Sequence, residues 1–247
     1  MLYLGPQKAK KTEDNAISTN WQQYYLQQAA QLKQPLLQQF YAKGMLAGHT
    51  PISQVPLVAI DFETTGFNPT DNGIVSIGLV PFNLQYIASS KARQWLLKPR
   101  FQLSDASVTV HRITHSEISN APDLNSILPE LLALLAGKVA VVHYRQIERP
   151  FFNAAITARL GEGMLFPLID TLELEARLHR AKPLNWWDKV RRRQHVSIRL
   201  DASRNRYNLP PYQPHHAVTD AIASAELLQA QIAHRFSPDT PVSELWC

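Results

Sequence analysis

The chain is poor in cysteine, and it lacks any long apolar run. Its single cysteine, Cys247, is the last of 247 residues, which excludes an intramolecular disulfide and a cysteine zinc cluster. No segment approaches membrane-spanning length, and the first residues contain no apolar stretch long enough for a signal peptide. There is no internal repeat, and the one biased tract is glutamine-rich, between Gln22 and Gln39. These absences predict a cytoplasmic protein that does not associate with membranes.

The composition is that of a folded protein, with 45% hydrophobic and 18% charged residues. At 247 residues the chain is long enough for one ordinary domain plus an appendage. We expect a mostly helical N-terminal extension over residues 1–52, a main domain over 53–236 and a short tail over 237–247.

Positive charge is concentrated in one segment. Between Arg180 and Arg206 there are nine basic and two acidic residues, a local net charge of +7 against +5 for the whole chain. A basic patch on a near-neutral body suggests that a polyanion binds at one place. A solvated basic face is the simpler interpretation of the charge alone.

The chain is organised around residues 57–66, where four apolar residues run into Asp-Phe-Glu-Thr-Thr-Gly. The apolar run predicts a buried strand, and Gly66 permits the turn that ends it. Because strand side chains alternate faces, Asp61 and Glu63 point the same way and Phe62 points opposite. Two carboxylates side by side at the end of a buried strand need a cation, a shared proton or a basic partner.

The N-terminal extension carries aromatic and leucine side chains at helical spacing from Trp21 to Tyr41. The segment Ser18-Thr19-Asn20 offers an N-cap, with Gln22 three residues after Thr19 as in a capping box. Pro35 should divide the segment into two helices, and Gly44 should end the second. The aromatic stripe is expected to pack on the main domain, with binding of a protein partner as the alternative.

The main domain alternates strand and helix signals. Further strands are expected over 73–80 and 86–97, forming an antiparallel meander with the first. The second half predicts a helix over 122–135, a strand over 138–142, a helix over 146–160 and a strand over 166–169. This alternation predicts an α/β sheet with parallel pairings.

Two more clusters carry polar groups suited to chemistry. His143 follows a predicted strand and Glu148 lies early in the next helix, while His215 and Asp220 stand five residues apart near the C-terminus. Positions five apart on a helix differ by roughly 140°. His215 and Asp220 can therefore share a site only if His215 precedes the helix and Asp220 lies in its first turns, a boundary that Pro214 favours.

Together these three motifs resemble those of the DEDDh, or DnaQ-like, 3′–5′ exonucleases, over about residues 55–233. Supporting stretches are Val110-His111-Arg112-Ile113-Thr114, Ile169-Asp170-Thr171-Leu172 and Arg206-Tyr207-Asn208-Leu209-Pro210. The resemblance implies an RNase H-like fold, a five-stranded mixed sheet flanked by helices.

The resemblance also implies that acids bind two divalent metal ions, Mg²⁺ or Mn²⁺, while a histidine activates the attacking water. Asp61 would bridge both metals, Glu63 and Asp220 would complete the coordination, and His215 would be the general base. The implied product is a nucleoside 5′-monophosphate. Implied substrate contacts come from Phe62, Thr64, Thr65 and Gly66, with the ring of Phe62 facing the core. For His111, a substrate contact and a role in the architecture of its loop remain equal alternatives.

The sequence departs from the family pattern at three positions. Glu148 stands where the second motif has aspartate, Tyr144 where asparagine is common, and Arg112 where glycine is frequent. In relatives the second-motif acid often reaches the metals through water, a role that tolerates a longer side chain, so we expect activity to be retained.

Several polar residues outside these motifs have simpler interpretations. Asp170 is expected to cap the helix that it opens, and His143 to orient its loop. His216 could exchange roles with His215, but only His215 has the family spacing to Asp220. For Trp186-Trp187 with Arg191, Arg192 and Arg193, base stacking beside phosphate contacts and docking on the core remain equal alternatives.

The predicted function is a metal-dependent 3′–5′ exonuclease that acts on the 3′ end of single-stranded nucleic acid, with DNA favoured. The alternatives are an RNA-directed exoribonuclease of the same family and a nucleic-acid-binding pseudonuclease, with Glu148 as a sign of decay. A replicative proofreading subunit is less favoured, because the extension is N-terminal and little follows Phe236.

Overall fold

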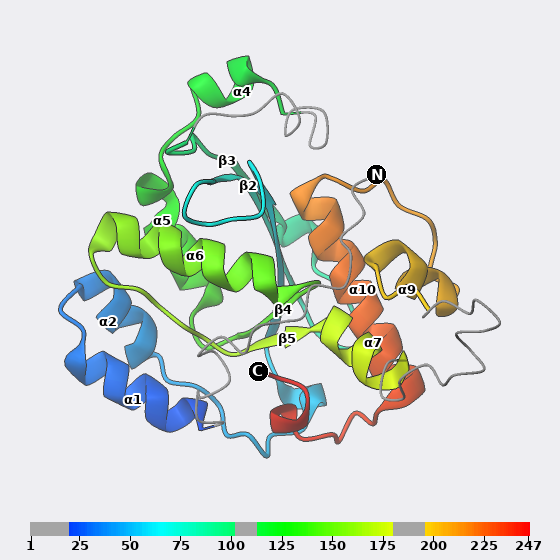
Figure 1. Ribbon diagram of the computed structural model, residues 1–247. Coiled ribbons are helices and arrows are strands. Elements are labelled where there is room, and N and C mark those ends of the chain that lie inside the picture. Colours follow the sequence, from blue (N-terminus) through cyan, green and yellow to red (C-terminus); the bar gives the residue numbers. More distant parts are fainter. Residues whose placement is uncertain (1–19, 102–112, 180–195) are drawn as a thin grey trace, which may run out of the picture.

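A computed structural model describes residues 20–101, 113–179 and 196–247, and its centre is a five-stranded sheet of order β3-β2-β1-β4-β5 (Figure 1). The strands are β1 Leu57–Thr64, β2 Ile74–Phe82, β3 Arg93–Leu96, β4 Val139–Val142 and β5 Leu168–Asp170. β1 pairs with β2, and β2 with β3, in antiparallel fashion, whereas β1–β4 and β4–β5 are parallel. The mixed sheet of the RNase H-like fold, including the antiparallel meander, is therefore confirmed.

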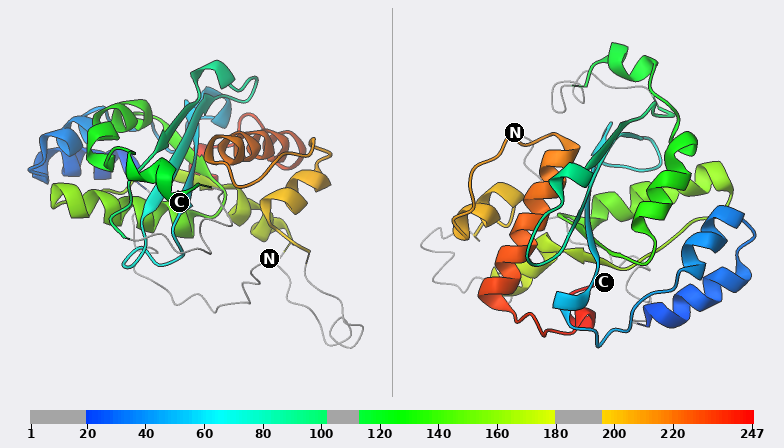
Figure 2. Two further views of the ribbon diagram at one scale, coloured as in Figure 1. Left: turned by 90° about the horizontal axis from the view of Figure 1, so that it is seen from above. Right: turned by 180° about the vertical axis from the view of Figure 1, so that it is seen from behind.

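Helices cover both faces of this sheet. The α-helices are α1 Trp21–Gln31, α2 Pro35–Ala42, α4 His115–Ser119, α5 Leu124–Leu135, α6 Arg145–Leu160, α7 Thr171–His179, α9 Leu200–Arg206 and α10 Ala217–Arg235. Short 3₁₀ helices are η2 Ile52–Gln54, η3 Ser89–Lys91 and η4 Val242–Glu244. Figures 1 and 2 show α5 and α6 on one face and α10 on the other, with α7 and α9 beside α10. Among the described helices, none is long and apolar enough to cross a membrane.

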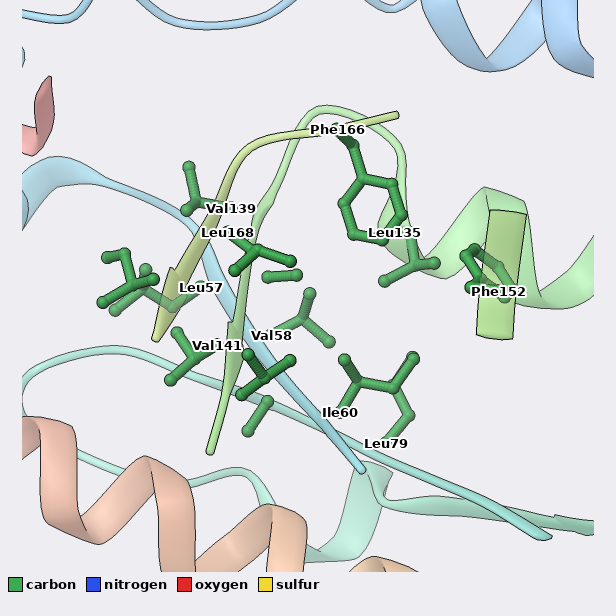
Figure 3. Packing of buried hydrophobic residues seen from close by; sticks show 14 of the residues in the cluster. Leu57, Val58, Ile60, Leu79, Leu135, Val139, Val141, Phe152, Phe166 and Leu168 are labelled. Atoms are coloured by element: carbon green, nitrogen blue, oxygen red, sulfur yellow. The ribbon is translucent and has the colours of Figure 1, made fainter. Parts of the chain in front are cut away.

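The core follows from the strand alternation of β1. Val58, Ile60 and Phe62 are buried, and the Phe62 ring packs on Phe152 of α6 with ring centroids 5.6 Å apart. Figure 3 shows Val58, Ile60 and Leu79 gathered with residues of α5 and α6. Asp61 and Glu63 alternate with these residues and so face α10.

The N-terminal helices belong to the same hydrophobic core. Trp21, Tyr25 and Tyr41 are fully buried in it, and the Tyr41 hydroxyl donates to the Leu165 carbonyl at 2.8 Å. The Glu162 carboxylate accepts hydrogen bonds from the backbone amides of Lys33 and Gln34, between α1 and α2, at 2.9–3.1 Å. The aromatic stripe thus packs inward, as expected.

The two-helix division of the extension is also as predicted. Pro35 opens α2, and Gly44 follows its end with φ +71°. The N-cap of α1 is Asn20, whose side chain accepts from the Gln23 amide at 3.1 Å. The expected N-cap segment thus supplies the cap through Asn20, while Thr19, on which the capping box was placed, lies outside the described residues.

The third strand is shorter than predicted. It covers only Arg93–Leu96 instead of 86–97. The Asn83 side chain accepts from the amides of Gln85 and Tyr86, both at 2.9 Å, which fixes a turn. The chain touches β2 briefly through the isolated bridge between Phe82 and Ile87, η3 then occupies the next residues, and regular pairing with β2 begins at Arg93.

The last residues lie along β5. Trp246 is buried and forms an antiparallel bridge with Ile169, and the backbone groups of Cys247 and Leu168 exchange hydrogen bonds at 2.9 and 3.3 Å. Arg149 of α6 donates to the Cys247 carbonyl. These contacts cover the open edge of the sheet.

Candidate active site

Three carboxylates converge at the end of β1. Oxygen atoms of Asp61, Glu63 and Asp220 all lie within 4.8 Å of one another. The register of β1 on β2 shifts between Glu63 and Thr64, an irregularity that ends regular pairing beside the acids. The cluster therefore joins the central strand to the first turn of α10.

The close approach of α10 depends on Gly78 of β2. Gly78 pairs with Asp61, and a Cβ on it would lie 2.1 Å from the Ala217 carbonyl carbon and 2.3 Å from the Val218 nitrogen. The first turn of α10 thus rests directly on the glycine backbone. This contact brings Asp220 within reach of Asp61.

The start of α10 holds the third acid in place. Oδ2 of Asp220 accepts hydrogen bonds from the backbone amides of His215 at 2.8 Å and His216 at 3.1 Å. His215 lies outside the helix with φ +69° and an exposed side chain, and Asp220 lies in the first turn. The predicted arrangement, histidine before the helix and aspartate inside it, is confirmed.

Glu148 is the fourth acid of the region and lies outside the three-acid cluster. It is buried in the first turn of α6, and its Oε2 has no hydrogen-bond partner among the described residues. Burial, together with the charges of Asp170 and Glu63, raises the pKa of Glu148.

The electrostatics of the cluster suit a divalent cation. Burial raises the pKa of Asp61 well above its usual value, and the charges of Asp220, Glu63 and Glu148 add to this. Burial and the Glu63 charge likewise raise the pKa of Asp220, against the hydrogen bonds from His216 and His215. Crowded, poorly hydrated oxygen donors with one unpartnered buried oxygen nearby fit a hard cation such as Mg²⁺ or Mn²⁺.

Hydrogen bonds within the protein account for the buried polar groups of Asp170 and for the orientation of the His143 ring. Asp170 accepts from the amides of Tyr144 and Arg145 at the start of α6, both at 3.0 Å, and from two amides at the start of α7. His143 Nδ1 hydrogen-bonds the Thr171 hydroxyl at 2.8 Å, and burial lowers the pKa of His143 to about 4. The expected capping role of Asp170 is confirmed, and it extends to a second helix.

The predicted substrate-contacting residues border the acids. Thr64 donates to the Gly66 carbonyl at 2.7 Å, and Thr65 Oγ1 accepts from the Gly73 amide at 3.0 Å, so both hydroxyls shape the loop. The Phe62 ring is committed to the core, which leaves its backbone for contacts. His111, Arg191, Arg192, Arg193 and the Trp186-Trp187 pair lie outside the described residues.

The basic segment proves to be partly internal. Arg204 is buried and pairs with Glu226 at 2.6 Å, and Arg206 pairs with the fully buried Glu175, which also accepts from Tyr207 at 2.9 Å. These two arginines are therefore not available to a polyanion as the charge count implied. Sequence reasoning missed Arg204, because nothing near it in the chain marks it as buried.

A mixed sheet whose central strand delivers clustered acids to a helix-borne aspartate is the arrangement of metal-dependent nucleases of the RNase H-like class. The family model RNase_T, described as Exonuclease, matches residues 58–228. The chain belongs to this family, that of the DnaQ-like 3′–5′ exonucleases.

Similar proteins agree with this assignment. The PolC-type DNA polymerase III of Thermotoga maritima is 27% identical over 182 residues, which cover 74% of this chain but only 12% of the polymerase. The nuclease domain of 3′hExo, a DEDDh family member bound to rAMP, has a TM-score of 0.56 at 16% identity and is covered over 94% of its length, with 76% of this chain. Exonuclease I of E. coli, in complex with a dT13 oligonucleotide, has a TM-score of 0.56 at 13% identity, covering 74% of this chain and 42% of that one.

Proposed function

We propose that the protein is a two-metal 3′–5′ exonuclease that removes nucleoside 5′-monophosphates from single-stranded 3′ ends, with DNA favoured. The observation that carries this proposal is the convergence of Asp61, Glu63 and Asp220 within 4.8 Å. Bound divalent metals would act as Lewis acids that stabilise charge on the reacting phosphate.

The residues of the chain have distinct parts in this proposal. Asp61, Glu63 and Asp220 hold the metals, and the backbone amides of His215 and His216 orient the Asp220 carboxylate. The His215 imidazole accepts a proton from the water whose oxygen bonds to phosphorus. The bond between phosphorus and the 3′ oxygen breaks, and the released 3′ oxygen takes a proton from solvent water to become a hydroxyl. The exposed position of His215, whose amide is bonded to Asp220, suits a base that must meet solvent water.

Glu148 acts in this proposal through water. Its separation from the three-acid cluster and its unpartnered Oε2 support an indirect role. Its charge still adds to the field at Asp61, which strengthens the demand for cations. The longer side chain thus replaces the aspartate of relatives without entering the cluster.

Of two similar solved structures, one contains the ribonucleotide rAMP and the other a dT13 oligonucleotide. The test therefore uses 5′-labelled single strands of DNA and of RNA with the same base order, incubated with Mg²⁺ or Mn²⁺ and resolved as product ladders. We expect single-nucleotide shortening from the 3′ end, faster on DNA, and complete loss with EDTA.

Asp220→Ala is the matched control for the ladder, because it removes one of the three clustered acids that would bind metal. It should fold and be inactive. If the wild type bound the strand but hydrolysed none of it at any concentration of either metal, the protein would be a pseudonuclease. Faster shortening of the RNA strand would make the protein an exoribonuclease.

A further inference from the structure

We propose that Arg204 and Tyr212 form a positioning pair that fixes Asp220 and the His215 loop for metal binding and catalysis. The pair is defined by the Arg204 guanidinium, which lies under the Tyr212 ring, 4.9 Å from its centroid. This inference rests on the proposed function of the cluster formed by Asp61, Glu63 and Asp220.

Arg204 is anchored to α10 on one side. Only 2% of the residue is exposed, Nη1 donates to the Ala223 carbonyl at 2.9 Å, and the same nitrogen pairs with Glu226 at 2.6 Å. A buried guanidinium needs such partners, and its planar fork fixes their directions. Arg204 is therefore fixed relative to the helix that carries Asp220.

On the other side Arg204 holds the loop that leads to His215. Nη2 donates to the Pro210 carbonyl at 2.9 Å, two residues before the ring that covers the guanidinium. Three prolines between Leu209 and His215 stiffen this loop. One buried arginine thus ties the loop to the third turn of α10.

Tyr212 carries the connection to the acid. Its ring covers Arg204, and its hydroxyl is near enough to the Asp220 carboxyl for each group to shift the pKa of the other. Asp220 accepts hydrogen bonds from the His215 and His216 amides, so the loop that Arg204 and Tyr212 hold is bonded at its end to this carboxylate. Hydrogen bonds to a ligating carboxylate fix its orientation, and their loss costs about 10–100-fold in metal affinity or activity.

The left-handed backbone of His215, with φ +69°, gives the pair a second task. A non-glycine residue keeps that conformation only where its surroundings enforce it. Two contacts hold this conformation. The His215 amide donates a hydrogen bond to Asp220, which follows it in the chain, and Arg204 binds the Pro210 carbonyl in the segment before it. Tyr212 thereby acts on the metal ligand through its hydroxyl and on the base through its ring.

The experiment separates the two tasks with Tyr212→Phe, Tyr212→Leu and Arg204→Lys. Mn²⁺ affinity is measured by calorimetry without substrate, kcat and KM on a labelled strand, and Tm by calorimetric scanning. Tyr212→Phe should weaken Mn²⁺ binding by about 10-fold and regain its kcat at saturating Mn²⁺. Tyr212→Leu and Arg204→Lys should keep a lowered kcat at saturating Mn²⁺, because the His215 loop is released.

Tyr86→Phe is the matched control, since it removes the hydroxyl of an exposed tyrosine in the β2–β3 turn. Unchanged Mn²⁺ affinity in Tyr212→Phe would overturn the hydroxyl role. Recovery of full kcat by Tyr212→Leu at saturating Mn²⁺ would overturn the ring role. If the wild type hydrolyses no strand, the proposed function fails, while the Mn²⁺ affinities of wild type and Tyr212→Phe still decide the contact with Asp220.

Discussion

Replacing Gly78 by alanine tests how closely α10 must sit on the sheet. The added Cβ would lie 2.1 Å from the Ala217 carbonyl carbon, whereas ordinary contact begins at 3.4 Å. Because the Ala217 carbonyl carbon is a backbone atom in a closely packed interior and cannot swing aside, the first turn of α10 must retreat by about 1.3 Å. Such overpacking costs about 1–3 kcal/mol of stability, and Tm falls by about 2–4 °C per kcal/mol in a domain of this size.

The retreat carries Asp220 and the His215 loop away from Asp61. A misplacement of about 1 Å at a reacting centre costs about 10²-fold in rate. We therefore expect Gly78→Ala to remain folded, to bind Mn²⁺ more weakly in calorimetry and to lose about 10²-fold in kcat/KM on a labelled strand.

Gly44→Ala is the control for stability alone. Gly44 follows α2 with φ +71°, and a Cβ added to it would meet no atom within 4 Å, so alanine there is strained without a clash. It should lower Tm by a similar amount, since the left-handed conformation costs about 1–2 kcal/mol, and should leave Mn²⁺ affinity unchanged. If Gly78→Ala and Gly44→Ala had equal kcat/KM and equal Mn²⁺ affinity, the close contact of α10 with Gly78 would not be what places Asp220.

Three further predictions concern the acids and the base. His215→Ala should lower kcat by about 10²–10⁴ with Mn²⁺ binding retained, and His216→Ala should be mild; the opposite order would reassign the base. In a metal titration on one labelled strand, the rate of Glu148→Asp should stay within about tenfold of wild type, or about 1.4 kcal/mol of barrier. Glu148→Gln should need more metal for its activity, and an equal loss of rate in both variants would contradict the role of Glu148 through water. Because the pKa of Asp61 is raised in the fold, the protonated carboxyl stabilises the metal-free protein. This contribution is complete below about pH 4, the pKa of an unfolded aspartate, and is lost as the pH rises through the raised pKa. Asp61→Asn should therefore raise the metal-free Tm relative to wild type increasingly with pH, and a constant difference in Tm would contradict this sign.

The elements that sequence predicted well are those with local signals. The apolar run into Asp61 and Glu63 predicted β1 and the shared face of its acids, because alternation along a strand is a local rule. The five-residue spacing from His215 to Asp220 predicted the helix boundary by geometry alone. The start of the third strand was predicted wrongly, because the Asn83 side chain accepts hydrogen bonds from the Gln85 and Tyr86 amides and so favours a turn over extended chain.

The supporting parts of the site depend on contacts between distant segments. Gly78 looks like an ordinary strand glycine until Ala217 is placed against it, more than a hundred residues along the chain. Arg204 resembles any other basic residue in a charged segment, and its pairing with Glu226 and its bonds to the Ala223 and Pro210 carbonyls compensate its burial. Residue type and spacing identify the acids, whereas tertiary packing decides what holds them.

The double capping by Asp170 limits how the site can change over evolution or by design. Asp170 stands near Glu148, so it is an obvious candidate to replace Glu148 if that acid is lost. Its oxygens already accept amides from the starts of both α6 and α7, and turning toward the cluster would leave those amides without an acceptor. The Asp170 carboxylate is thus committed to two helices, and β5 offers no spare acid that a suppressor mutation could recruit to the site.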